Sequence, residues 1–92
     1  MWYNTYVRIE LLPHAESQLF ERGLTLNNVK ATLENPDQVI CGNSKEIKIA
    51  QKICKNKGKK FLYRVVFIEQ DDKYKVVTVY RTSKIKKYLK ED

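Results

Sequence analysis

The sequence predicts an α+β domain in which an N-terminal strand and a two-helix hairpin pack on an antiparallel sheet, followed by a short C-terminal helix. Two observations predict this class. Between Pro13 and Pro36, apolar residues recur at the three- and four-residue spacing of helices. From Asp37 onward, segments rich in Val, Ile, Phe and Tyr alternate with turn sequences, as in paired strands. All 92 residues are expected to form one domain.

The first strand and helix are predicted from alternation and from end signals. Residues 5–11 alternate, with Ile9 and Leu11 on the apolar side. Pro13 suits the first position of a helix over 13–22, where a missing N–H costs nothing. Gly23 then suits a left-handed cap residue that ends this helix.

The second helix is predicted from Thr25, a favourable N-cap residue. Leu24 and Val29 stand at the spacing of a hydrophobic staple around that cap. The sequence Asn35-Pro36 ends the helix, because the residue before a proline avoids helical geometry. Its buried stripe is predicted to be Leu26, Val29 and Leu33.

Four strands and a short helix are predicted beyond residue 37, and one of the strands is the lysine-rich stretch 45–60 described below. Residues 38–41 form a short strand, and residues 60–69 and 73–82 form two long strands that are apolar on both faces and therefore central. Gln70-Asp71-Asp72 marks the turn between the long strands. Residues 83–92 predict a basic helix capped by Ser83 or Thr82.

The lysine-rich stretch 45–60, "KEIKIAQKICKNKGKK", fits a helix or a strand. Its β-branched residues and the turn sequence "NKGKK" favour the strand. We expect its isoleucines to face the helices and its lysines to face an open, concave and basic surface of the sheet. That surface would form one wall of a groove for a polyanion.

The net charge of +7 is unevenly distributed. Residues 1–42 hold three Lys or Arg against five Asp or Glu, whereas residues 43–92 hold fifteen against six, so the halves carry −2 and +9. A basic half of a small domain is typical of proteins that bind a polyanion or an acidic protein. The alternative is a solvated lysine-rich surface.

The composition also limits location and cofactors. The sequence has no apolar run long enough to span a membrane and no signal peptide, so a cytoplasmic protein is expected. Cys41, Cys54 and a single histidine are too few for a structural zinc site, and the two cysteines are expected to be free thiols. No metal, nucleotide or haem site is predicted, and no cofactor is expected.

Three pieces of the chain resemble a known family. They are "HAESQLFERGLT" followed by "VKATLENPDQVI", "KIAQKI" followed by "GKKFLYRVVF", and "KVVTVYRTSKIKKYL". Together they look like a small bacterial domain family of unknown function related to BrnT, and through BrnT the chain is similar to the RelE/ParE toxin superfamily. The resemblance covers Val7 to Leu89.

The resemblance implies an activity and partners. Toxins of this superfamily cleave mRNA, including ribosome-associated mRNA, without a metal, by attack of the ribose 2′-hydroxyl on the adjacent phosphate. Arg81 and Tyr88 match the arginine at the end of the last strand and the aromatic residue soon after it in BrnT-like chains. An acidic antitoxin is the implied protein partner. ParE-like relatives inhibit gyrase, so the fold does not fix the target.

Four residues are candidates for catalysis. His14 lies in the first helical turn, in a polar stripe with Gln18 and Arg22, and could take a proton from the 2′-hydroxyl or brace the helix. Arg64 stands in an apolar strand, so it must pair with Glu10 or Glu69 or contact a phosphate. The candidate catalytic residues are His14, Arg64, Arg81 and Tyr88.

A further set would bind RNA through cations and aromatic planes. These candidates are Arg22, Lys48, Lys52, Tyr80 and Lys84. Whether Arg64 and Arg81 share a sheet face depends on the hairpin register. A two-residue Gln70-Asp71 turn puts them on one face, whereas a loop over 69–73 puts them on opposite faces. The non-catalytic alternatives are an RNA-binding module and a module that binds an acidic protein.

Overall fold

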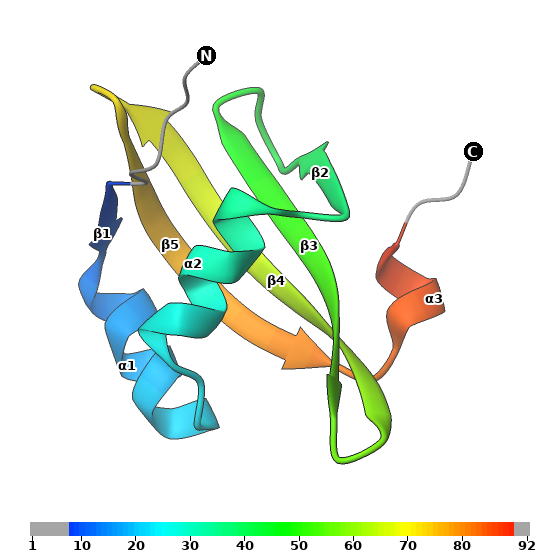
Figure 1. Cartoon of the computed structure of the whole chain (residues 1–92). Helices are drawn as coiled ribbons and strands as arrows, with labels where there is room; N and C mark the ends of the chain where they lie inside the picture. Colours follow the sequence, from blue (N-terminus) through cyan, green and yellow to red (C-terminus); the bar gives the residue numbers. More distant parts are fainter. Residues whose placement is uncertain (1–7, 90–92) are drawn as a thin grey trace.

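A computed structural model describes residues 8–89 and has five strands and three helices within that range. The predicted α+β class is confirmed (Figure 1). The strands form one sheet in the order β1-β5-β4-β3-β2, so β4 and β5 lie inside it as predicted. The elements are β1 (Ile9–Leu11), α1 (Pro13–Arg22), α2 (Leu26–Glu34), β2 (Gln38–Cys41), β3 (Ile47–Asn56), β4 (Lys59–Gln70), β5 (Lys73–Thr82) and α3 (Ile85–Tyr88).

One pair of strands departs from the predicted antiparallel sheet. β1 pairs parallel with β5, with Ile9 beside Tyr74 and Leu11 beside Val76, whereas every other neighbouring pair is antiparallel. The parallel direction lets α1, which follows β1 at once, pack back against β5. Residues 5–7 of the predicted first strand lie outside the described residues.

The ends of α1 and α2 follow their local sequence signals. Gly23 has a φ of 65°, and its N–H bonds back to the last turn of α1, as predicted for a left-handed cap. Thr25 and Asn28 form a capping box at α2: the Thr25 hydroxyl accepts from the Asn28 N–H at 3.2 Å, and the Asn28 side chain accepts from the Thr25 N–H at 2.9 Å.

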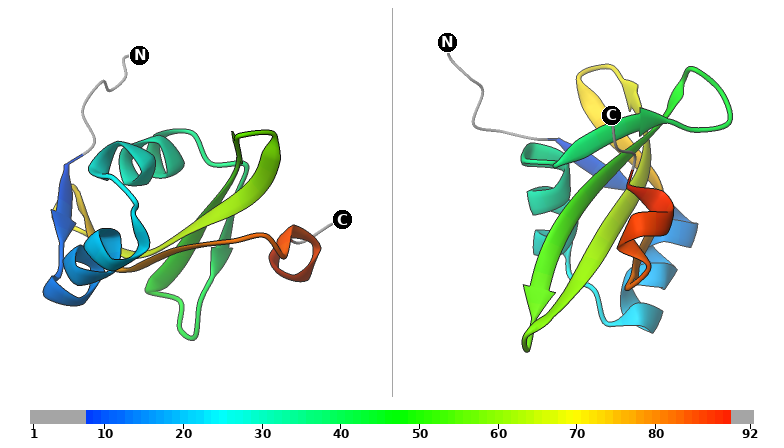
Figure 2. Two further views of the ribbon diagram at one scale, coloured as in Figure 1. Left: turned by 90° about the horizontal axis from the view of Figure 1, so that it is seen from below. Right: turned by 90° about the vertical axis from the view of Figure 1, so that its right-hand side faces the viewer.

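Both long helices cover the same face of the sheet (Figure 2). The core between them includes Ala15, Leu19, Leu24, Val29, Leu33, Ala50, Val65, Phe67, Val76 and Val79. The predicted stripe of α2 is wrong at Leu26, which is 49% exposed. Thr32 is buried in its place, because its hydroxyl donates to the Asn28 carbonyl at 2.8 Å and so carries no unsatisfied group into the core.

Two tight hairpins connect the long strands. The β3–β4 turn is Lys57-Gly58, with φ angles of 53° and 81°, and the β4–β5 turn is Asp71-Asp72, with φ angles of 53° and 62°. Positive φ at both central residues matches the right-handed twist of the flanking strands. Stretch 45–60 therefore folds as the predicted strand and turn.

A β-bulge decides where the two arginines point. Val66 pairs with Thr78 but Phe67 pairs with Val76, so β5 carries one extra residue at this point. Arg64 consequently pairs with Tyr80, and Arg81 pairs with Tyr63 on the other face. The two arginines therefore lie on opposite faces of the sheet, as the second alternative predicted. The loop over 69–73 in that alternative is wrong, because a two-residue turn and the bulge together produce this arrangement.

The face of the sheet opposite α1 and α2 carries the isoleucines of β3, so the expected orientation of the isoleucines, and of Lys48 and Lys52, is wrong. Ala50 packs under the helices at 1% exposure, so alternation puts Lys48 and Lys52 on the helix side and the isoleucines on the other side. The isoleucines pair with aliphatic residues of β4: Ile47 with Ile68, Ile49 with Val66, and Ile53 with Leu62. α3 lies on this second face, near one end (Figure 2).

The C-terminal helix is shorter than predicted. α3 spans four residues, and neither predicted residue caps it: Lys84 is the N-cap, without a side-chain bond. The Thr82 hydroxyl instead accepts from the Lys84 N–H at 3.0 Å, ahead of the helix. Residues 90–92 of the predicted helix lie outside the described residues. Within residues 8–89, no helix is long and apolar enough to cross a membrane.

Candidate nucleic-acid interface

Arg64 is the centre of a buried polar network on the second face of the sheet. Its side chain extends from β4 and the residue is 7% exposed. The guanidinium Nε donates to Gln51 Oε1 at 2.7 Å, and Nη1 donates to the Tyr80 hydroxyl. Gln51 is fully buried, and its Nε2 donates to Gln38 Oε1 at 2.9 Å. The network therefore ties β2, β3, β4 and β5 together.

Tyr88 of α3 covers this network. The Arg64 Cζ lies 4.3 Å from the centroid of the Tyr88 ring and 5.4 Å from that of Tyr80, within the range of cation–π attraction. The two rings meet edge to face at 6.3 Å. Gln51 Nε2 also donates to the Tyr88 carbonyl at 3.3 Å, which fastens α3 to β3.

No carboxylate neutralises Arg64 within residues 8–89. The two acids proposed as partners bind lysines instead: Glu10 pairs with Lys73 at 2.8 Å and Glu69 pairs with Lys48 at 3.1 Å. Lys73 also holds the pKa of the Glu10 carboxyl below its ordinary value, through their hydrogen bond and their charges. Arg64 is thus a buried cation whose hydrogen-bond partners among the described residues are neutral.

Gln18 and Arg22 form hydrogen bonds with the part of the β5 edge that β1 does not pair with. The Val79 N–H donates to Gln18 Oε1 at 2.9 Å, and Arg22 Nη1 donates to the Val79 carbonyl at 3.3 Å. β1 pairs with β5 only over residues 74–76, so these side chains replace the missing strand at Val79. The Arg22 Cζ also lies 5.9 Å from the centroid of the Tyr80 ring. Gln18 and Arg22 of the predicted polar stripe therefore have a structural role.

Exposed cations gather at one end of the molecule, which we call the basic end. The tip of the β3–β4 hairpin, the end of β5 and α3 meet there, since Leu62 pairs with Thr82. All its cations are exposed and none forms an ion pair within residues 8–89. They are Lys55, Lys57, Lys59, Lys60, Arg81, Lys84, Lys86 and Lys87.

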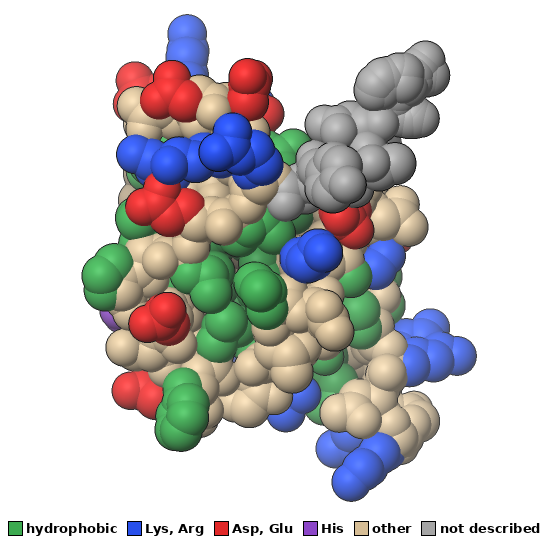
Figure 3. Space-filling model, turned by 60° about the vertical axis from the view of Figure 1, so that its left-hand side comes forward, with side chains coloured by type: hydrophobic (Ala, Val, Ile, Leu, Met, Phe, Trp, Pro, Cys, Tyr) green, Lys and Arg blue, Asp and Glu red, His purple; other side chains and the backbone are tan. Residues whose placement is uncertain are grey.

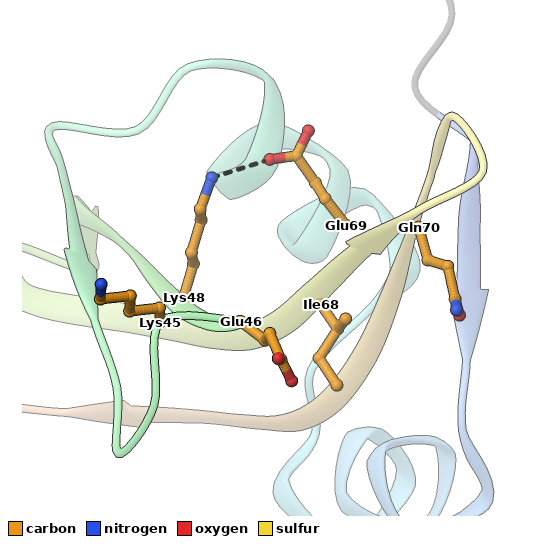
Figure 4. Close-up of a pocket in the computed structure, with 6 residues that line it drawn as sticks. All are labelled: Lys45, Glu46, Lys48, Ile68, Glu69 and Gln70. Atoms are coloured by element: carbon orange, nitrogen blue, oxygen red, sulfur yellow. Dashed lines mark hydrogen bonds and ion pairs between the residues drawn. The ribbon is translucent and has the colours of Figure 1, made fainter.

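The opposite end carries both signs of charge. In Figure 3, acidic and basic side chains mix at the top, the end that holds the Asp71-Asp72 turn, while Lys and Arg gather at the lower right. A pocket at the mixed end is lined by Lys45, Glu46, Lys48, Ile68, Glu69 and Gln70. Figure 4 shows the Lys48–Glu69 ion pair across it. Charge at this end is largely compensated.

The predicted catalytic residues do not converge on one site. Arg64 and Tyr88 are in contact. Arg81 lies on the other sheet face, with its Cζ 5.0 Å from the centroid of the Phe61 ring. His14 is exposed in the first turn of α1, on the helix side, and its side chain makes no hydrogen bond or ion pair with any described residue.

The predicted RNA-binding residues divide in the same way. Lys84 lies free at the basic end, whereas Lys48 is ion-paired and Lys52 donates to the Asn35 carbonyl at the end of α2 at 2.9 Å. Tyr80 is bonded to Arg64. The predicted set does not include the other exposed lysines of the basic end, which are Lys55, Lys57, Lys59, Lys60, Lys86 and Lys87. Four of them lie at the tip of the β3–β4 hairpin, whose turn the sequence "NKGKK" predicts.

Both cysteines are free thiols, as expected. Cys41 is exposed on β2, and Cys54 is half-buried on β3. Burial raises the pKa of the Cys54 thiol, which favours its protonated form. Within residues 8–89, no cluster of His, Cys, Asp and Glu could hold a metal ion.

A family model described as a domain of unknown function, DUF4258, matches residues 11–81. The match runs from the last residue of β1 to the penultimate residue of β5 and includes Arg64, Tyr80 and Gln51. α3, with Tyr88, follows the matched range. No curated protein and no solved structure matches the chain.

Proposed function

The chain belongs to the DUF4258 family of domains of unknown function, and we propose that it is a toxin-like protein that binds RNA at its basic end. The observation that carries this proposal is the unpaired charge of that end. No Asp or Glu stands between Glu46 and Glu69, or between Asp72 and Glu91. Cations that lack a partner attract the phosphates of a nucleic acid and release its counterions on binding.

Aromatic side chains at the same end favour single-stranded RNA as the polyanion. Phe61 and Tyr88 are half-buried beside the cations, with Phe61 next to Arg81 and Tyr88 next to Lys87. Partly exposed rings allow unpaired bases to stack, which is how proteins hold single strands. The resemblance to BrnT and to RelE toxins supports RNA, including mRNA on the ribosome, over other polyanions.

Metal-independent RNA cleavage is the activity we propose for this toxin-like protein. The ribose 2′-oxygen would attack the adjacent phosphorus, give its proton to a base and displace the 5′-oxygen, which takes a proton. The products are a 2′,3′-cyclic phosphate and a 5′-hydroxyl. Arg64 would hold the phosphate and Tyr88, in contact with it, would move a proton.

The binding proposal is tested with two variants of equal net charge. Lys55, Lys59 and Lys60, all at the basic end, are changed to Gln in one, and Lys30, Lys45 and Lys75, all elsewhere, in the other. Fluorescence anisotropy measures the affinity for a single-stranded RNA between 50 and 300 mM salt. Because each phosphate contact contributes about 0.7 to the salt slope, the first variant should lose roughly 2 from the slope and bind about 100-fold more weakly at 0.1 M salt.

The Lys30, Lys45 and Lys75 variant should stay within a fewfold of the parent protein. Equal weakening of both variants, or binding that does not respond to salt, would contradict the proposal. The cleavage step is read in the same samples by mapping RNA ends in EDTA. Cyclic phosphate ends that disappear with Arg64→Met support the cleavage step. RNA that stays intact although the protein binds it fully would contradict cleavage and leave an RNA-binding module.

A protein-binding role is the second candidate, because part of the second sheet face is aliphatic and uncovered by the long helices. Ile47, Ile49, Val66 and Ile68 lie half-buried there in adjacent register. A partner with apolar and acidic side chains, such as an antitoxin, would suit this face and the nearby cations. Ile49→Asp should abolish binding of such a partner and leave RNA binding unchanged.

A further inference from the structure

Among residues 8–89, no neighbour of the Arg64 side chain supplies the negative charge that would balance its guanidinium. The residue is buried to more than nine-tenths, and its bonds go to an amide oxygen and a phenol. Burying a cation among neutral groups costs free energy that an anion would recover. No described residue accepts from the remaining guanidinium N–H groups, so part of its donor fork is unused.

The side chains around Arg64 hold this fork in place. Gln51 Oε1 binds Nε, and Gln51 is in turn oriented by Gln38 and by the Tyr88 carbonyl. Tyr80 binds Nη1 from the neighbouring strand. A guanidinium fixed at two nitrogens needs little reorganisation to receive an oxyanion, and its planar fork suits two phosphate oxygens.

The cover over this site is weakly held. α3 spans four residues, has no side-chain cap and has no acid in its first turn. Its lysines Lys84, Lys86 and Lys87 repel the cation beneath it. The Tyr88 ring over Arg64, its edge-to-face contact with Tyr80 and one hydrogen bond from Gln51 oppose that repulsion. An anion at Arg64 would remove the charge that draws the ring inward and would favour an open α3.

We propose that Arg64, Gln51 and Tyr80 form a binding site for one phosphate group, and that α3 closes it through Tyr88 when the site is empty. The inference rests on the proposed function, because the phosphate of a bound RNA strand is the ligand that the basic end would deliver. The ring of Tyr88 is then both the plug of the site and a surface on which a base can stack once α3 has moved.

The test compares the affinity of four full-length proteins for inorganic phosphate and for a 2′-O-methylated dinucleotide, measured by calorimetry and by thermal shift. They are the parent, Tyr88→Ala, Tyr88→Phe and the double variant Tyr88→Ala with Arg64→Met. If the lid is closed nine-tenths of the time or more, Tyr88→Ala should bind phosphate at least about tenfold more tightly than the parent. Tyr88→Phe keeps the ring and should match the parent.

The double variant assigns the gain to Arg64. It should lose the tighter binding, and circular dichroism establishes that it is folded. If Tyr88→Ala binds no better than the parent, or if the double variant binds as well as Tyr88→Ala, the site and its lid are wrong. These outcomes leave the salt-dependent binding of RNA at the hairpin untouched, so the two proposals can fail separately.

The two ligands separate the sources of the phosphate. Binding of both confirms that the site accepts a backbone phosphate. Binding of inorganic phosphate alone would establish the site but exclude the strand as its ligand, and would overturn the link to RNA.

Discussion

The Gln18 side chain accepts one hydrogen bond from the backbone of β5, in the position where a neighbouring strand would otherwise accept it. The Val79 N–H is buried and donates to the Gln18 side chain, while Arg22 binds the carbonyl of the same residue. A buried N–H without a partner costs more than the bond itself contributes, because the alternative in water is lost. The two side chains thus close a sheet edge that β1 leaves open at Val79.

Gln18→Ala tests this contact. The variant leaves the Val79 N–H unpaired and should lower the free energy of unfolding by about 1–3 kcal/mol. For a domain of this size, each kcal/mol corresponds to roughly 4–8 °C in Tm, which differential scanning calorimetry measures. Ser17→Ala is the control, since Ser17 is exposed on the same helix and should change little. Equal effects of both substitutions would refute the assigned role.

At the scale of elements, the two hairpin turns are a natural comparison. Both need positive φ at two residues, but the β3–β4 turn has a glycine at the second and the β4–β5 turn has aspartates at both. A side chain in the left-handed region is strained, although Asp tolerates it better than most residues. The two adjacent carboxylates also repel each other.

Asp72→Gly should therefore stabilise the fold, by about 0.5–1 kcal/mol, because glycine relieves the strain at a φ of 62°. Gly58→Ala should destabilise it by about 1 kcal/mol for the converse reason. Urea denaturation measures both values. A loss of stability in Asp72→Gly would mean that the aspartate makes a contact worth more than the strain.

The sequence predicts an element well when the residues that determine it are close neighbours along the chain. Pro13, Gly23 and Thr25 act on neighbouring backbone, so both long helices are predicted almost to the residue. The Lys57-Gly58 turn and the β-branched residues around it likewise predict the third strand. The parallel pairing of β1 has no local signal, since its partner lies more than sixty residues away.

The faces of the strands were harder to predict, because one residue of register reverses them. The small residue Ala50 marks the side of β3 that packs under the helices. The three larger isoleucines were expected on that side, but they lie on the opposite face. The bulge in β5 beside Val66 decides whether Arg81 shares a face with Arg64, and no residue type in β5 marks it. The predicted contact between Arg64 and phosphate remains a prediction.

For the molecule as a whole, the division of charge along the sequence becomes a division in space. Glu69 and Glu10, near the Asp71-Asp72 turn, pair with Lys48 and Lys73, whereas the cations of the hairpin tip and of α3 form no ion pair with any described residue. The sequence predicted a basic half. Hairpin geometry determines which part of that half is free to bind, because it brings residues 55–60 and 81–87 to the same end.

The most direct test of the central claim, that RNA binds at this end, is an NMR titration of the 15N-labelled protein with a short single-stranded RNA. The account predicts that amide shifts will concentrate at residues 55–61 and 81–88, and that residues 45–48 and 69–75 will stay near their free positions. Shifts that concentrate at residues 45–48 and 69–75, or no shifts at low salt, would contradict it.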